Sequence, residues 1–188
     1  QIRTSFSNAA NGASRLATAW LFDPSNESFA VTASMGSARQ QSATAPIAGG
    51  KILVAGGLNN GGARVATAEI FDATSATFTA VAATMSVARQ GPAAAVLADG
   101  RVLIIGGFSG SSYQTSVEIF DPTTQTFSAT GSLNSARAFA AAARLADGRV
   151  LVAGGVAGSG ALNSAEIYNP ATGQFSALPV TMAVRRGG

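Results

Sequence analysis

The chain has 188 residues, a formal net charge of +3, only 11% charged residues, and neither cysteine nor histidine. Without thiolates and imidazoles it has no disulfides, and it lacks the usual ligands of zinc, copper and iron and the commonest proton-transferring side chain, so we expect no cofactor. The small positive charge is spread along the chain rather than clustered, and no apolar run approaches about 18 residues. Nucleic acid and membrane insertion are therefore not expected.

The dominant feature is a repeat. Gly-Gly pairs end an apolar run at intervals of 50 and 48 residues, and a phenylalanine recurs at intervals of 49, 49 and 48. The pairs are Gly56-Gly57, Gly106-Gly107 and Gly154-Gly155, and the phenylalanines are Phe29, Phe78, Phe127 and Phe175. Arginines recur in the same frame at Arg39, Arg89, Arg137 and Arg185. Three features in one register indicate a repeat protein.

Residues 1–37 contain only the later strands of a repeat, because residues 19–24 match the third strand and Phe29 opens the fourth. Residues 2–7 are a candidate for a worn second strand. Complete repeats are expected at 38–83, 84–132 and 133–181, and residues 182–188 begin a further one.

Each complete repeat predicts four short strands. The first is rich in alanine, and the second is apolar and ends in Gly-Gly. They are joined by Gly49-Gly50, Asp99-Gly100 and Asp147-Gly148, which are two-residue hairpin signals because both positions tolerate positive φ. Lys51, Arg101 and Arg149 open the second strands and are expected to be exposed hairpin flanks. This pattern indicates an all-β antiparallel fold.

Repeats of this length, with Gly-Gly after the second strand and an aromatic residue opening the fourth, resemble the kelch repeat. The residues that carry the resemblance are Gly56-Gly57, the run 69–72, Phe78 and Arg89, with their copies. The sequence is most similar to the Ala- and Thr-rich kelch variety of bacterial secreted and surface proteins, which implies an extracellular or cell-surface location. It differs in using Phe where the family often has Trp, and in lacking the His that often follows the Ala-Arg step.

The resemblance implies a β-propeller in which each repeat forms one four-stranded antiparallel blade. The residues agree, because alanine-rich first strands suit the crowded position beside the axis and Pro46 is tolerable on an edge strand facing the channel. The two aromatic positions of each repeat are expected to pack blade against blade. Kelch rings typically have six or seven blades, so this chain is expected to form part of a ring. Three arrangements are open: further blades lie beyond the ends, two chains complete one ring, or four blades close with an incomplete seam. The first is favoured.

The recurring charges allow two interpretations. The glutamates at 69, 118 and 166 favour an ion pair repeated at each blade interface, with the recurring arginines as candidate partners. Acid–base catalysis by a carboxylate pair requires two carboxylates with different pKa values in one cleft. Glutamates at identical repeat positions are expected to have identical surroundings, which argues against this use. The arginines lie where the chain passes from an outer strand to the next inner strand, near one rim of the channel. Two alternatives are open for these residues: they bond the loop carbonyls or the Asp of the neighbouring blade, or they form a ring that binds carboxylates or acidic sugars. The residues are Arg39, Arg89, Arg137 and Arg185.

Two loops, 58–64 and 108–115, vary most between repeats, and loops on a rigid scaffold commonly carry recognition. Phe108 and Tyr113 in the second loop are candidate ligand-binding residues. Tyr113 is either an exposed anchor for a protein or sugar or a locally packed side chain.

These features favour a non-catalytic binding or scaffolding propeller with a protein or glycan partner at the loops around the channel mouth. One alternative is a structural subunit of a surface or filament assembly, because the low charge content suggests covered surface. Another is the scaffold part of a galactose-oxidase-like or other sugar-processing enzyme, which the kelch resemblance introduces. Its active residues would lie outside this chain, because that copper chemistry needs His and Cys ligands.

Overall fold

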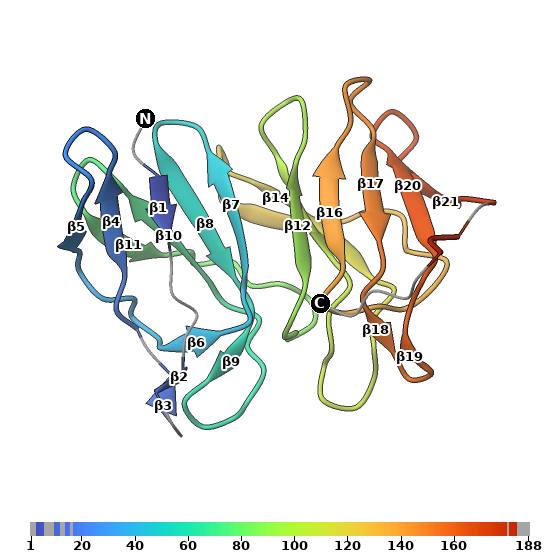
Figure 1. The fold of residues 1–188 in the computed structure, drawn as a ribbon, viewed down its shortest axis with the longest axis horizontal. Helices are drawn as coiled ribbons and strands as arrows, with labels where there is room; N and C mark the ends of the chain where they lie inside the picture. The colour runs from blue at the N-terminus through green and yellow to red at the C-terminus, as the bar shows by residue number, and fades with distance from the viewer. Residues whose placement is uncertain (1–2, 6–9, 12–13, 16, 180, 184–188) are drawn as a thin grey trace.

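The computed structural model describes residues 3–5, 10–11, 14–15, 17–179 and 181–183. Its main strands form four antiparallel sheets, which stand side by side in an open arc with the first and fourth sheets at opposite ends (Figure 1). Arg185 lies outside the described residues. The described part of the chain contains no helix that could cross a membrane.

The first sheet has three strands, in the order β1 (Arg3–Ser5), β4 (Trp20–Asp23) and β5 (Ser28–Val31). Arg3 pairs with Phe22 in this sheet, as Ile52 pairs with Phe71 in the second. β1 therefore occupies the position of a second strand, which agrees with the degenerate second strand predicted at residues 2–7.

Each of the other sheets has four strands in sequence order, and the alanine-rich first strand lies at an edge. The second sheet contains β7 (Ala43–Ile47), β8 (Lys51–Ala55), β10 (Ala68–Asp72) and β11 (Thr77–Ala80). The third contains β12 (Ala93–Val96), β13 (Val102–Ile105), β14 (Val117–Asp121) and β15 (Thr126–Ala129). The fourth contains β16 (Ala141–Arg144), β17 (Val150–Ala153), β20 (Ala165–Asn169) and β21 (Gln174–Ala177). The predicted all-β fold with four-stranded antiparallel blades is confirmed.

The two ends of the sheets differ in their connections (Figure 1). Tight turns at 48–50, 98–100 and 146–148 join the first and second strands, and we call this side the hairpin end. Longer loops at 58–64, 108–113 and 156–161 follow the second strands on the opposite side, which we call the loop end. Two short ladders lie there: β6 (Arg39–Gln40) pairs with β9 (Leu58–Asn59), and β18 (Val156–Ala157) pairs with β19 (Gly160–Ala161). Another, between β2 (Ala10–Asn11) and β3 (Ser14–Arg15), precedes the first sheet's β4.

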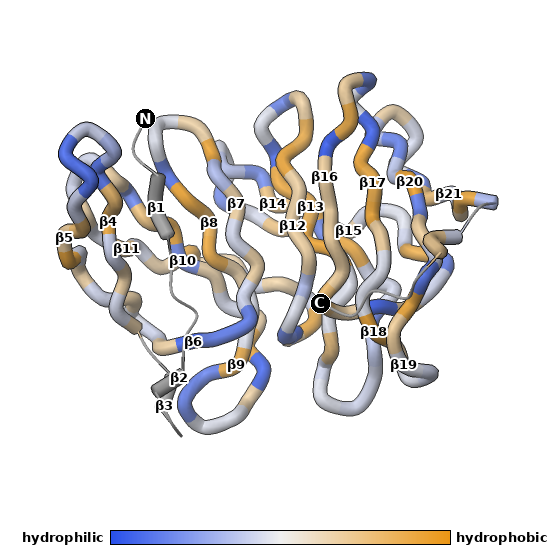
Figure 2. Tube along the Cα trace, in the orientation of Figure 1, coloured by the Kyte–Doolittle hydropathy of each residue, from blue (hydrophilic) through white to orange (hydrophobic). Residues whose placement is uncertain are grey.

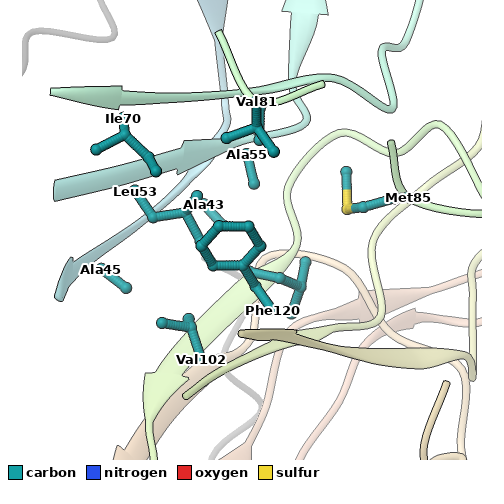
Figure 3. Close-up of a cluster of buried hydrophobic side chains, with 11 residues drawn as sticks. Ala43, Ala45, Leu53, Ala55, Ile70, Val81, Met85, Val102 and Phe120 are labelled. Atoms are coloured by element: carbon teal, nitrogen blue, oxygen red, sulfur yellow. The ribbon is translucent and has the colours of Figure 1, made fainter. Parts of the chain in front are cut away.

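The core lies between neighbouring sheets. Leu53 and Ile70 of the second sheet pack against Val102 and Phe120 of the third, and the Phe120 ring points toward Leu53 (Figure 3). Leu103 and Ile119 on the opposite face of the third sheet pack against Tyr168 of the fourth in the same way. Hydrophobic residues accordingly run along β8 and β17, and hydrophilic ones gather at the turns (Figure 2). Sheet-to-sheet burial of this kind is what joins the blades of a propeller.

The two aromatic positions of each repeat form cross-strand pairs. Their ring centroids lie 5.0 Å apart at Phe22–Phe29, 4.8 Å at Phe71–Phe78, and 4.9 Å at both Phe120–Phe127 and Tyr168–Phe175. Phe71, Phe120 and Tyr168 are buried, as expected for packing between blades. Phe29 in the first sheet is 58% exposed, so the expectation fails at this position, because no preceding sheet of the described residues covers that face.

Candidate functional site

The recurring arginines of the described residues are buried. Arg39, Arg89 and Arg137 are no more than 1% exposed, and each precedes the first strand of its sheet. Each forms an ion pair with the glutamate of the third strand in the same sheet. The pairs are Arg39–Glu69 at 2.7 Å, Arg89–Glu118 at 2.9 Å and Arg137–Glu166 at 2.9 Å. This confirms the expected ion pairing and places it within each blade.

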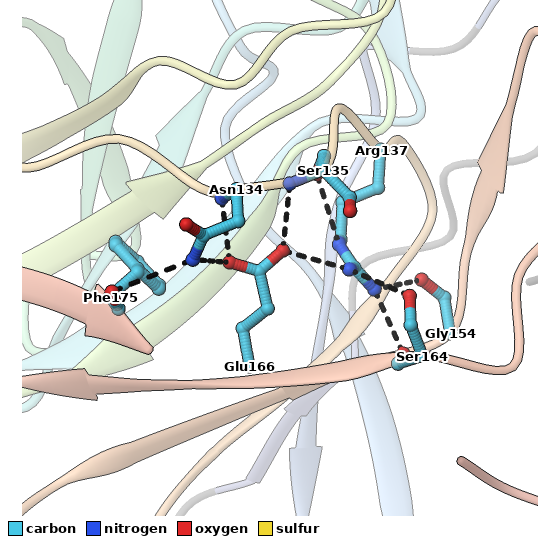
Figure 4. A network of polar contacts seen from close by, with 7 residues as sticks. All are labelled: Asn134, Ser135, Arg137, Gly154, Ser164, Glu166 and Phe175. Carbon is cyan, nitrogen blue, oxygen red and sulfur yellow. Dashed lines mark hydrogen bonds and ion pairs between the residues drawn. The ribbon is translucent and has the colours of Figure 1, made fainter. Parts of the chain in front are cut away.

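The network around Arg137 shows how completely the guanidinium group is used (Figure 4). Nη1 donates to the carbonyl oxygens of Gly154 at 2.9 Å and Ser164 at 3.0 Å. Nη2 donates to Ser164 Oγ at 3.1 Å and to Glu166 Oε1, and Nε donates to the carbonyl oxygen of Ser135 at 3.4 Å. A guanidinium has five N–H donors, so all five are satisfied. Arg39 and Arg89 repeat the pattern.

The glutamates hold the segments that connect one sheet to the next. Glu166 Oε2 accepts hydrogen bonds from Asn134 N at 2.7 Å and Asn134 Nδ2 at 2.9 Å, and Oε1 accepts one from Ser135 N at 3.0 Å. Glu69 and Glu118 bond the amides of Gly36 and Ser86 in the same way. Burial lowers the pKa of the Arg89 guanidinium, and the charge of Glu118 opposes this change. The pair thus fixes the connecting segment while each charge compensates the other.

The Gly-Gly pairs bring neighbouring sheets together at these arginines. Gly57 N donates to the carbonyl oxygen of Arg89 in the next sheet at 2.8 Å. Gly56 has a φ of +70°, and a Cβ there would lie 2.7 Å from the same carbonyl oxygen. Only glycine fits both the conformation and the close approach. The arginine backbone therefore bonds the preceding blade, and its side chain bonds its own.

These contacts favour the packing interpretation of Arg39, Arg89 and Arg137 over a ligand-binding ring. Their guanidinium groups point into the blades, and every donor is already bonded within the protein. The acceptors are carbonyls, a hydroxyl and a glutamate of the same repeat, rather than the Asp of a neighbouring blade.

Charges at the hairpin end are also paired, although they are exposed. Lys51 lies 3.5 Å from Asp72, Arg101 lies 2.7 Å from Asp99, and Arg149 lies 2.7 Å from Asp147. The side-chain hydrogen bond from Arg101 lowers the pKa of Asp99 below its ordinary value. Backbone and side-chain hydrogen bonds from Arg149 lower the pKa of Asp147 likewise. The strand-opening cations are hairpin flanks, as predicted.

The loop end carries a cluster of a different kind, formed by Arg64, Phe108 and Tyr113. The rings of Phe108 and Tyr113 lie 4.9 Å apart, and Arg64 Cζ lies 5.3 Å from the centroid of the Phe108 ring. This distance is that of a cation–π contact. The cluster joins loops of two neighbouring blades, and all three side chains are half-buried. The structure thus brings both predicted aromatic residues together with an arginine that the sequence analysis did not single out.

Backbone hydrogen bonds hold both loops of the cluster. Ser109 N donates to the carbonyl oxygen of Ser112 at 3.0 Å, and Gln114 N donates to that of Gly107 at 2.8 Å. In the other loop, Asn59 N donates to the carbonyl oxygen of Ala63 at 2.9 Å, and Asn59 Oδ1 accepts from Ala63 N at 3.0 Å. The side chains therefore stand on closed, ordered loops.

Two polar atoms beside this cluster lack partners. Arg64 Nε and Gln90 Oε1 are the buried side-chain nitrogen and oxygen atoms without a hydrogen-bond partner in the part of the chain that the structure describes. Gln90 pairs its backbone with Phe108 and donates from Nε2 to Gln41 Oε1 at 3.0 Å. Unpaired buried polar atoms are uncommon in proteins and are candidates for a functional explanation. Arg64 was detectable in the sequence as an arginine outside the repeat frame, whereas Gln90 gave no such signal.

The described residues contain no group of three or more Asp or Glu side chains placed to hold a metal ion. The loop-end cluster can offer a cation, two aromatic surfaces and amide groups to a ligand.

The family model of the kelch motif matches residues 91–134 and 137–179, which are the third and fourth sheets with their connections. These two segments are kelch repeats. The second sheet has the same strand order and the same arginine–glutamate pair as these kelch blades, so it is a blade of the same kind.

Among solved structures, the kelch blades match the structure of YjhT with a TM-score of 0.76 and 16% sequence identity. The match covers 90% of this chain and 61% of YjhT, so the chain spans about three fifths of that protein's length. At this identity the likeness shows the fold alone. No curated protein matches the sequence. The third and fourth sheets are thus kelch repeats, and the four sheets together share the fold of part of YjhT.

Proposed function

We propose that this protein is a non-catalytic binding module, which holds a protein or glycan partner at the loop end through Arg64, Phe108 and Tyr113. The observation that carries the proposal is the convergence of unpaired polar atoms and clustered aromatic rings at one place. Elsewhere, the recurring charges of the blades are bonded to one another. Aromatic residues and arginine on rigid loops are the side chains that most often dominate binding energy.

The proposal retains Phe108 and Tyr113 from the sequence analysis and transfers the cationic role from the recurring arginines to Arg64. The corresponding fourth-sheet loop, residues 156–161, contains neither a charged nor an aromatic residue, so the site belongs to the second and third blades. The sequence resembles the kelch variety found in bacterial secreted and surface proteins. We therefore also propose an extracellular or cell-surface location.

A second proposal concerns the first sheet, whose outer face is apolar and open. Trp20, Phe29 and Val31 are 42%, 58% and 63% exposed, and Trp20 pairs with Val31 across the two strands. Equivalent faces of the inner blades are covered by the preceding sheet. We propose that a further propeller blade, from the same or another chain, packs on this face.

Binding to a glycan array and to a displayed-peptide library tests the main proposal, with Tyr113→Ala as the loop-end variant and Lys51→Ala as the hairpin-end control. Tyr113→Ala should weaken a ligand of the wild-type protein about 10-fold or more, as loss of an anchor residue does, and Lys51→Ala should leave it unchanged. Ligands that bind Tyr113→Ala as tightly as wild type would contradict the proposed site. Circular dichroism of both variants checks that they are folded.

A further inference from the structure

The acidic residues are distributed unevenly between the two ends of the propeller. The chain has nine, and the three glutamates at 69, 118 and 166 are buried in pairs with the recurring arginines. The other six all lie in turns or strand ends at the hairpin end. They are Asp23, Glu27, Asp72, Asp99, Asp121 and Asp147. Among the described residues, no carboxylate side chain is therefore free at the loop end, and the field that a ligand would meet from these side chains is positive.

Arg64 is a charged side chain at that end without a counter-ion. Among the residues whose side chains are described, it forms no ion pair, and its Nε has no acceptor. The recurring arginines, in contrast, each use all five donors. An arginine that is half-buried but unpaired retains donors for a group that the protein itself does not supply.

The position of Arg64 is nevertheless fixed. Its guanidinium lies over the Phe108 ring, and a Cβ on Gly110 would lie 3.4 Å from Nη1. The contact with the aromatic ring orients the planar group without consuming its hydrogen-bond donors, and the absence of a side chain at Gly110 leaves room for it. Little conformational entropy then remains to be lost when a ligand binds.

We propose that Arg64 binds a carboxylate group, and that the apolar part of the same ligand lies against Phe108 and Tyr113. This inference rests on the proposed function and adds the chemical class of the ligand. A carboxylate suits the site because it is planar and matches the fork of a guanidinium with two parallel hydrogen bonds. Among the described residues, the glutamates toward this end are paired with the recurring arginines, so no unpaired acidic side chain there repels the ligand.

The direct test is a titration followed by amide chemical shifts, with benzoate and benzamide as probes. The two molecules have almost the same shape, but only benzoate carries the charge. Benzoate should shift amides of residues 58–64 and 108–113, bind at least about 10-fold more tightly than benzamide, and weaken as salt is raised.

Three substitutions localise the contact. Arg64→Met keeps the length of the stem and should weaken benzoate about 10-fold or more, whereas Arg64→Lys, which keeps the charge but loses the fork, should weaken it less. Arg144→Met is the matched control, because Arg144 is an exposed arginine without an ion pair that lies near the hairpin end. It should leave benzoate binding unchanged.

Equal affinities for benzoate and benzamide, or an unchanged affinity in Arg64→Met, would overturn the carboxylate assignment. If array or library ligands still depend on Tyr113 in that case, the binding function stands and only the ligand class is wrong. Parallel titrations with glucuronate and with a blocked glutamyl peptide identify the source of the carboxylate. A preference of either over its neutral amide supports the assignment, and no preference in either series contradicts it.

Discussion

The third and first sheets pair their last two strands in the same register but use one repeat position in opposite ways. In the third sheet, Glu118 pairs across the strands with Ala129 and is buried against Arg89. In the first sheet the same register position holds Trp20, which pairs with Val31 and is 42% exposed. The aromatic pair two residues further along is present in both, as Phe120–Phe127 and Phe22–Phe29.

Comparing the two sheets shows which features form within a single blade and which depend on the neighbouring blades. Strand pairing and the cross-strand aromatic contact form in both sheets, because they depend on residues within one repeat. Burial of the charged position requires an arginine and a connecting segment that lies across the sheet. In the first sheet, where the described residues place no such arginine, the apolar Trp20 takes the position, and its face remains open to a partner blade.

The largest effect should come from removing one charge of a buried pair. Arg89→Met leaves Glu118 buried with its counter-ion gone and removes one donor from each of the carbonyls of Gly106 and Ser116. The free energy of unfolding should fall by about 3–5 kcal/mol, as measured by urea denaturation. The double variant Arg89→Met, Glu118→Leu should recover part of this loss, since no charge is then stranded. A single variant as stable as wild type would show that the pair does not hold the blade.

A smaller effect should distinguish the covered and open apolar faces. Val102 is fully buried between the second and third sheets, whereas Val31 is 63% exposed. Val102→Ala should lower the free energy of unfolding by about 2 kcal/mol, since two buried methyl groups are lost and a small cavity remains. Val31→Ala should change it by less than about 0.5 kcal/mol. Similar losses for the two substitutions would mean that the face of the first sheet is already covered, and light scattering would then identify an associated state.

The smallest effect should be the pH dependence of the exposed hairpin pairs. Because its pKa is lowered in the folded protein, Asp99 contributes stability above its unfolded pKa of about 3.9 and loses it as pH falls through the folded value. Asp99→Asn should cost a few tenths of a kcal/mol near neutral pH, as for other exposed pairs, and nothing once both states are protonated. Unfolding curves of wild type and variant should therefore converge below about pH 3.9. A constant difference over this range would exclude the pair with Arg101 as its cause.

The fold could be predicted largely from the sequence. Gly-Gly, the hairpin dipeptides and the two aromatic positions recur at fixed spacing, and each has a local conformational reason that one repeat contains. The pairing of the recurring glutamates with the recurring arginines was also predictable, because both series follow the same period. Exposure of Phe29 was not, because burial of that residue depends on whether another sheet stands beside it.

The candidate site was predictable in part. Phe108 and Tyr113 were recognisable as large residues in a loop that differs between repeats. Arg64 lies more than 40 residues earlier in the chain. Its contact with Phe108 depends on how two neighbouring blades are placed, and no local pattern encodes that. Gln90 became notable only through an unpaired atom, which can be recognised only when all of its neighbours are known.

The sequence alone determined the repeat, the strands and the residues that close each blade, because these are set by interactions within about 50 residues of chain. The tertiary structure decided which charged side chains bond other groups of the protein and which retain hydrogen-bond donors for a ligand. Arg89 and Arg64 are chemically identical, and they differ only in their surroundings: five acceptors for the first, an aromatic face for the second. Burial and partners arise from packing between blades, so the division between structural and binding arginines appears only when the blades are assembled.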